Sequence, residues 1–179
     1  MTQQQRSGLV HLYCGDGKGK TTAAVGLIVR ALGQGFRVMM VQFLKSGRSG
    51  EVTLLRQLPG IEILAGQVTH QFSNVMTEEE RAATRALHLD FFHTAVRRVR
   101  EQAVDLLVLD EILGAILSDT MPEDELISFL DKRPNSLEVV LTGRRASDSV
   151  MQRADYISEI RCVRHPYERG IKARKGIEY

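Results

Sequence analysis

Short apolar runs alternate with stretches of helical periodicity along the whole chain. Several of these runs are almost entirely apolar, as strands covered on both faces of a sheet must be. Strands separated by helices are typical of parallel sheets with crossover connections. The expected strands are residues 9–14, 37–43, 61–65, 106–110, 138–142 and 157–163. The pattern predicts a three-layer α/β fold with a mostly parallel sheet of about six strands.

Polar residues mark the ends of the intervening helices. Thr77 stands three residues before Glu80, the spacing of a capping box, and predicts a long helix that ends at about Gln102. The segment 120–123 repeats this arrangement before a second helix, and Pro134 is a stop signal beyond it. The glycine- and serine-rich segment 46–50 is expected to be a loop.

The long helical pattern contains both histidines and apolar residues. We expect His88 and His93 to lie at the surface or an interface, and the nearby basic cluster at 97–100 to form a solvated face. The apolar set recurs near helical spacing, so core packing is its expected role. Its members are Leu87, Phe91, Phe92, Ala95 and Val96.

Composition narrows the classes of function. The 179 residues predict one domain, with residues 1–7 as a flexible N-terminus and 165–179 as a C-terminal extension. The net charge is +2, from 24 basic and 22 acidic residues, which argues against nucleic acid or anionic membranes as partners. With no apolar stretch long enough to span a bilayer, a cytoplasmic location is expected. Cys14 and Cys162 lack metal-type spacing and are expected to be reduced thiols.

A glycine-rich turn between the first strand and the first helix predicts a phosphate-binding loop. Glycines allow several backbone N–H groups to approach a phosphate, and the helix N-terminus adds a favourable dipole. In the pattern G-x-x-x-x-G-K-[ST], the lysine adds positive charge and the hydroxyl binds Mg²⁺. Cys14 stands where the strict pattern has its first glycine. The predicted loop residues are Gly15, Asp16, Gly17, Lys18, Gly19, Lys20, Thr21 and Thr22.

Two carboxylates end a buried strand later in the chain. Asp110 and Glu111 close the run 105–111, and strand ends in open α/β sheets face the ligand crevice. Carboxylate and hydroxyl oxygens are suitable ligands for Mg²⁺ (or Mn²⁺) next to a nucleotide. The predicted metal ligands are therefore Thr21, Asp110 and Glu111, and the predicted catalytic residues are Lys20, Thr21 and Glu111.

These parts serve two reaction classes equally well. In a hydrolase, Glu111 would be the general base for a water that attacks the γ-phosphate of ATP. In an adenosyl transfer, a nucleophile attacks the ribose C5′ and triphosphate leaves, so Lys20 and the metal stabilise the leaving group without a base. A carrier that binds nucleotide or corrinoid without chemistry is a third alternative.

Further motifs resemble the ATP:corrinoid adenosyltransferases of the P-loop type. The resemblance covers nearly the whole chain and is more specific than a phosphate loop alone. It rests on the loop together with segments 41–45, 109–111, 133–134, 141–144 and 154–155 and the ending 165–179. It implies a RecA-like homodimer that transfers the 5′-deoxyadenosyl group of ATP to a Co(I) corrinoid, after an electron donor has reduced Co(II).

The resemblance also implies site residues. Residues 15–22 would hold the phosphates, Thr21 and Glu111 the metal, and Arg144 a phosphate or a neighbouring nucleotide group. Many family members carry a Gly-Phe-Thr-Trp-like run that faces the corrinoid, whereas this chain has no tryptophan and shows Gly-Gln-Val-Thr-His-Gln-Phe at 66–72. Phe72 is therefore expected to supply the aromatic face for the corrinoid. A histidine ligand to cobalt, such as His70, is not expected.

Overall fold

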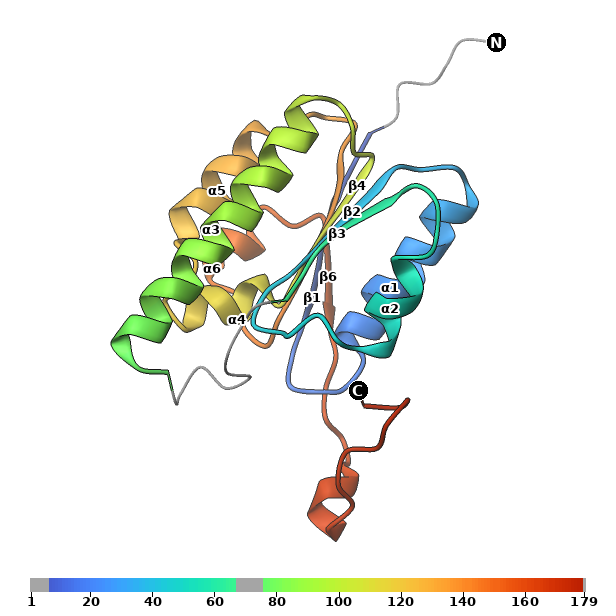
Figure 1. Ribbon diagram of the computed structural model, residues 1–179, viewed down its shortest axis with the longest axis vertical. Helices are drawn as coiled ribbons and strands as arrows, with labels where there is room; N and C mark the ends of the chain where they lie inside the picture. Colours follow the sequence, from blue (N-terminus) through green and yellow to red (C-terminus); the bar gives the residue numbers. More distant parts are fainter. Residues whose placement is uncertain (1–6, 67–75, 179) are drawn as a thin grey trace.

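One parallel sheet of six strands organises the protein, in the order β3-β2-β4-β5-β1-β6 (Figure 1). The computed structural model describes residues 7–66 and 76–178. The strands are β1 Val10–Cys14, β2 Val38–Gln42, β3 Ile61–Leu64, β4 Leu106–Asp110, β5 Glu138–Thr142 and β6 Tyr156–Glu159. The predicted number and direction of the strands are confirmed.

Helices cover both faces of this sheet. On one face lie α1 (Lys20–Gly33) and α2 (Gly50–Leu55). The other face carries α3 (Glu78–Arg100), α4 (Ile112–Leu117), α5 (Glu123–Lys132) and α6 (Asp148–Met151) (Figure 1). Beyond β6, the chain continues below the sheet through a short 3₁₀ helix, η2 (Pro166–Arg169). The three-layer arrangement is the one the alternation of runs predicts.

The core consists of two apolar layers, one on each side of the sheet. Along β2, Met39 and Val41 belong to the layer under α3 and α5, whereas Val38 and Met40 belong to the layer under α1. Alternate strand residues point to opposite faces, so a strand buried on both sides must be apolar throughout. This requirement explains why the central strands were recognisable in the sequence.

Helix α3 forms as its capping signal predicts. The Thr77 hydroxyl accepts a hydrogen bond from the N–H of Glu80, and the Glu80 carboxylate accepts one from the N–H of Thr77. The helix buries a stripe at helical spacing, namely Thr84, His88, Phe92, Ala95 and Val99. Core packing is confirmed for Phe92 and Ala95, and Phe91 and Val96 pack partly buried beside them.

Three sequence expectations are wrong in detail. His88 is fully buried rather than at the surface. The second capping box does not form, because the N-cap of α5 is Pro122 and the Thr120 hydroxyl is buried and donates to the Ala115 carbonyl instead. Strand β6 ends at Glu159 rather than at 163, since its neighbour β1 ends at Cys14 and the chain then packs against the loop that follows β1.

Candidate functional site

The loop between β1 and α1 has the backbone geometry of an anion site. Gly15 and Gly19 have φ angles of 103° and 121°, which favour glycine strongly. A Cβ on Gly15 would lie 2.4 Å from the Ile160 carbonyl oxygen. The required glycine is thus at position 15, and Cys14, still paired in β1 with Glu159, can carry a side chain. The first turn of α1 begins after Gly19, with no side-chain cap, so its N–H groups are available to an anion.

Lys20 is held under this loop. Its ammonium donates to the carbonyl oxygens of Gly15 and Gly17, each at 2.7 Å, and the residue is 9% exposed. Burial lowers the pKa of the Lys20 ammonium and the nearby Arg144 lowers it further, while Glu111 opposes the shift. The charge is therefore oriented before any phosphate arrives.

Asp110 is the centre of a buried hydrogen-bond cluster at the end of β4. Its side chain is fully buried and accepts hydrogen bonds at both oxygens. Oδ1 accepts from the hydroxyls of Thr21 (2.9 Å) and Thr142 (2.8 Å). Oδ2 accepts from Gln42 Nε2 (3.1 Å) and Lys45 Nζ (2.8 Å). The cluster joins the first helix to the ends of β2, β4 and β5.

Glu111 turns the chain sharply after β4. It adopts the left-handed conformation, with φ 61°, and its N–H donates to the Thr142 hydroxyl at 2.8 Å. Gly114 leaves space for the side chain, because a Cβ there would lie 3.2 Å from Glu111 Oε2. Burial raises the pKa of the Glu111 carboxyl and Asp110 raises it further, whereas Lys45, Lys20 and Arg144 lower it. The carboxylate thus lies within the electrostatic reach of both lysines.

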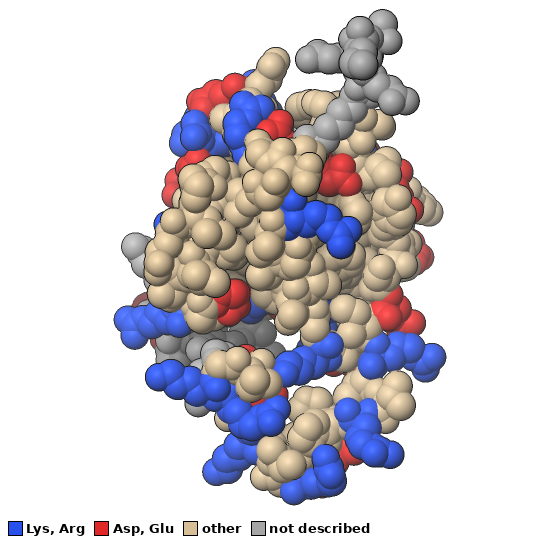
Figure 2. Space-filling model, turned by 90° about the vertical axis from the view of Figure 1, so that its right-hand side faces the viewer, with Lys and Arg blue, Asp and Glu red and all other residues tan. Residues whose placement is uncertain are grey.

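The segment after β6 packs against the phosphate loop. Gly17 donates its N–H to the Ile160 carbonyl at 2.7 Å, and Asp16 accepts from the Cys162 N–H at 3.1 Å. Lys18 pairs with Glu178 at 3.0 Å. Figure 2 shows Lys and Arg side chains gathered in the lower part of the molecule, where Figure 1 places this segment. Asp16 and Lys18 therefore use their side chains to hold the C-terminal segment beside the loop.

Comparison with known proteins decides between the reaction classes. A family model described as ATP:corrinoid adenosyltransferase BtuR/CobO/CobP matches residues 6–179. The chain belongs to this family. The corrinoid adenosyltransferase of Escherichia coli is 34% identical over 98% of this chain and 88% of its own length. The corrinoid adenosyltransferase CobA of Salmonella typhimurium is 36% identical over the same shares of the two chains. The protein is accordingly an enzyme of ATP-dependent corrinoid adenosylation.

Solved structures of lower identity show the P-loop ATPase fold. EccC of Thermomonospora curvata (ATPases 2 and 3, with a signal sequence peptide) superposes with a TM-score of 0.53 at 19% identity, covering 89% of this chain and 32% of that chain. The cytoplasmic domain of EssC gives a TM-score of 0.50 at 15% identity, covering 96% and 39%. This chain thus has the P-loop ATPase fold that the sequence predicted.

The structure brings most of the predicted site residues together. The phosphate loop, Asp110 and Glu111 meet at the carboxyl edge of the sheet, where parallel sheets bind ligands. Arg144 follows β5, its carbonyl accepts from the Gly15 N–H at 2.9 Å, and its side chain is exposed. Thr22 is also exposed on the first turn of α1. Phe72 and His70 lie outside the described residues.

Three site residues were missed because they come from other strands. Gln42 ends β2, Lys45 lies three residues after it and Thr142 ends β5, yet all three contact Asp110. All three lie in segments that carry the family resemblance, 41–45 and 141–144, although no role was assigned to them. The available signal was their position at strand ends that share one edge of the sheet.

The donor set at this edge suits a divalent cation. Thr21, Asp110 and Glu111 offer hydroxyl and carboxylate oxygens, the ligands that Mg²⁺ prefers. Gln42 Oε1 is buried beside them and accepts no hydrogen bond from the described part of the chain. Within the described residues, 7–66 and 76–178, no cluster of three or more His, Cys, Asp or Glu forms a separate metal site. Cys14 and Cys162 are free thiols. The residues present therefore fit the expected metal.

His88 connects the core to the segment that carries Lys45. Its Nε2 accepts from the Leu44 N–H at 3.3 Å, so Nδ1 holds the proton and faces the Thr120 hydroxyl at 3.1 Å. Leu44 has a φ of 54°, a conformation that costs energy for a leucine. Burial lowers the pKa of His88 to about 4. The neutral imidazole thus anchors the backbone next to Lys45.

His88 should make folding stability depend on pH. Below its unfolded pKa of 6.5, the unfolded chain binds a proton that the folded protein excludes until about pH 4. Stability from the neutral imidazole is thus complete above pH 6.5 and falls by up to about 3 kcal/mol as the pH drops towards 4. Urea unfolding of the wild type and His88→Gln between pH 4 and 7.5 checks this. Equal pH slopes for the two proteins would contradict it.

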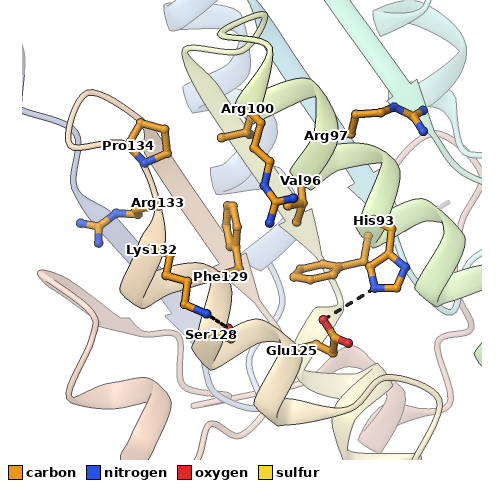
Figure 3. A pocket seen from close by; sticks show the side chains of 12 residues that line it. His93, Val96, Arg97, Arg100, Glu125, Ser128, Phe129, Lys132, Arg133 and Pro134 are labelled. Carbon is orange, nitrogen blue, oxygen red and sulfur yellow. Dashed lines mark hydrogen bonds and ion pairs between the residues drawn. The ribbon is translucent and has the colours of Figure 1, made fainter.

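A separate pocket of about 360 Å³ lies between α3 and α5 (Figure 3). Apolar side chains such as Phe129 and Val96 form part of its wall, and His93 and Glu125 face each other at 3.6 Å on its rim. The surface position expected for His93 is confirmed by its 58% exposed side chain. None of the predicted site residues that the structure describes lines this pocket. It is distinct from the phosphate-binding edge of the sheet.

In the part of the chain that the structure describes, no helix is both long and apolar enough to cross a membrane.

Proposed function

We propose that the chain transfers the 5′-deoxyadenosyl group of ATP to the Co(I) centre of a corrinoid and releases triphosphate. The supporting observation is a family match over residues 6–179, together with a glycine-rich loop that holds Lys20 and a Thr21–Asp110 hydrogen bond at the same end of the sheet. In this reaction Co(I) provides both electrons of the new Co–C5′ bond. The bond between C5′ and the α-phosphate oxygen breaks, and its electrons leave with the triphosphate.

The residues of the site match the needs of the leaving group. The amides of the first turn of α1 and the Lys20 ammonium are placed to stabilise the negative charge that develops on the triphosphate. A divalent ion held by Thr21, Asp110 and Glu111 would neutralise further phosphate charge. Co(I) is itself the nucleophile, so Glu111 acts as a metal ligand and no general base is needed. Arg144 adds positive charge beside the loop.

The family resemblance also implies an electron donor and a homodimer. Co(I) requires an electron donor that reduces the Co(II) corrinoid, and we expect the enzyme to work in the cytoplasm as a homodimer. Light scattering of the purified chain measures the mass of the assembly. A monomer at assay concentration would contradict the dimer.

The deciding experiment is anaerobic. Protein, ATP, Mg²⁺ and chemically reduced cob(I)alamin are mixed, the loss of cob(I) is followed by absorbance, and the products are analysed. We expect triphosphate and a light-sensitive alkylcobalamin in equal amounts. If cob(I) persists while ATP becomes ADP, the chain is a hydrolase with Glu111 as base. Tight binding of both ligands without turnover would indicate a carrier.

Phe72 is proposed to present its ring to the corrinoid. Phe72→Ala should lower adenosyl transfer about 5- to 150-fold, since an aromatic face lost from a binding site removes about 1–3 kcal/mol of contact energy. ATP affinity, measured by calorimetry, should not change. Phe91→Ala serves as a control for the loss of an aromatic ring elsewhere, because Phe91 packs against the core. An unchanged transfer rate in Phe72→Ala would place the aromatic face on another residue.

A further inference from the structure

Lys45 places a positive charge between two of the proposed metal ligands. Its ammonium donates to Thr21 Oγ1 at 2.9 Å and to Asp110 Oδ2 at 2.8 Å. Asp110 is fully buried, whereas the Lys45 side chain is 32% exposed. A monovalent cation belonging to the chain thus occupies the space between the hydroxyl and the carboxylate.

The buried Asp110 carboxylate needs such a charge. Thr21, Thr142 and Gln42 supply hydrogen bonds, but neutral donors do not cancel a full negative charge away from water. The Lys45 ammonium supplies the missing charge and a fourth hydrogen bond. The ion pair therefore stabilises the cluster before any ligand binds.

A divalent cation and the ammonium cannot share these two oxygens. The Thr21 hydroxyl donates its proton to Asp110 Oδ1 and accepts from Lys45, so one of its two lone pairs already faces the lysine. A metal bound to the other lone pair and to Asp110 would lie beside the ammonium and would repel it strongly at contact distance. Binding of the metal requires Lys45 to leave.

The local structure permits this exchange. Lys45 lies in the irregular segment between β2 and α2, and its side chain reaches solvent. The backbone before it is fixed by the Leu44–His88 hydrogen bond, and Gly47 after it has a φ of 69°. The flexible side chain can thus swing out while β2 and its neighbours stay in place.

We propose that Lys45 is a place-holding cation that neutralises Asp110 in the empty enzyme and releases Thr21 and Asp110 to the divalent metal. This inference rests on the proposed metal site. It predicts that free metal binds weakly, because the ammonium competes with it. Metal that enters with ATP is favoured, since the triphosphate offers the displaced ammonium a new partner at the same edge of the sheet.

Metal binding without nucleotide tests the proposal directly. Mn²⁺ affinity is measured by electron paramagnetic resonance for the wild type, Lys45→Met and the remote control Lys132→Met, whose lysine contacts Ser128 on α5. We expect Lys45→Met to bind Mn²⁺ about tenfold or more tightly than the wild type, and the control to match the wild type. Mg²⁺ should also raise the melting temperature of Lys45→Met more than that of the wild type.

Equal Mn²⁺ affinities in Lys45→Met and the wild type, or no Mn²⁺ binding by either, would overturn the proposal. Lys45→Gln, which retains a donor for Asp110 without the charge, serves in the same test if Lys45→Met does not fold. The anaerobic transfer assay on the wild type reports on the proposed function separately. Active wild-type enzyme with equal Mn²⁺ affinities would therefore refute the place-holding role alone.

Discussion

Replacing Lys20 by alanine is expected to lower adenosyl transfer by about 10²–10³-fold, the usual effect of removing one oriented charge from a developing anion. The ammonium is buried and already aligned by two carbonyl oxygens of the loop, so little reorganisation is needed when triphosphate forms. Removing it takes away the charge that stabilises the leaving group. Single-turnover formation of the alkylcobalamin measures the loss.

The same substitution also removes two hydrogen bonds that stabilise the loop, from the Lys20 ammonium to the carbonyl oxygens of Gly15 and Gly17. ATP affinity and urea unfolding are therefore measured beside the transfer rate, with Lys132→Ala as a control on the surface of α5. We expect Lys132→Ala to behave as the wild type. Retention of full activity by a folded Lys20→Ala protein would refute the assignment of the phosphate site.

The strands of the sheet could be predicted because the apolar pattern that marks each of them lies within a few consecutive residues. Strands buried on both faces must be largely apolar, and β2 and β4 are apolar up to their last residues, Gln42 and Asp110. All four residues of the edge strand β6 are exposed rather than buried, so no such constraint marks its end. Its true length depends on β1, which turns into the phosphate loop after Cys14. An end set by a distant neighbour leaves no local signal.

The candidate site likewise has a part that could be predicted from the sequence and a part that could not. The phosphate loop and the Asp110–Glu111 pair are contiguous motifs, so spacing alone identified them. The partners of Asp110 lie 32, 65, 68 and 89 residues away from it in sequence, and only the register of the sheet brings them together. In the sequence, nothing distinguishes Lys45 from an ordinary surface lysine.

The errors at His88 and Thr120 have a common cause. Each residue is polar, and each was assigned to solvent or to a helix end. In the structure they satisfy one another, because His88 Nδ1 faces the Thr120 hydroxyl and that hydroxyl donates to the Ala115 carbonyl. A polar pair that completes its hydrogen bonds internally is tolerated in the core.

Asp110→Asn is expected to lower both the stability of the protein and its transfer rate. If the amide nitrogen replaced Oδ2, it would face two donors, Gln42 Nε2 and Lys45 Nζ. If the amide nitrogen replaced Oδ1 instead, the cost would be lower, because the hydroxyls of Thr21 and Thr142 can rotate to accept hydrogen bonds from it. Lys45 then keeps a carbonyl contact but loses its ion pair.

We expect Asp110→Asn to reduce the free energy of unfolding by about 2–3 kcal/mol, below the full value for a wholly buried pair because Lys45 is 32% exposed. Urea unfolding measures it, and Asp131→Asn, which breaks the exposed pair with Arg153, is the matched control. The control should lose much less, since exposed pairs contribute little. The transfer rate should fall only in Asp110→Asn, because one proposed metal ligand is then neutral. Equal losses of stability in the two variants would mean that the cluster around Asp110 is no stronger than a surface ion pair.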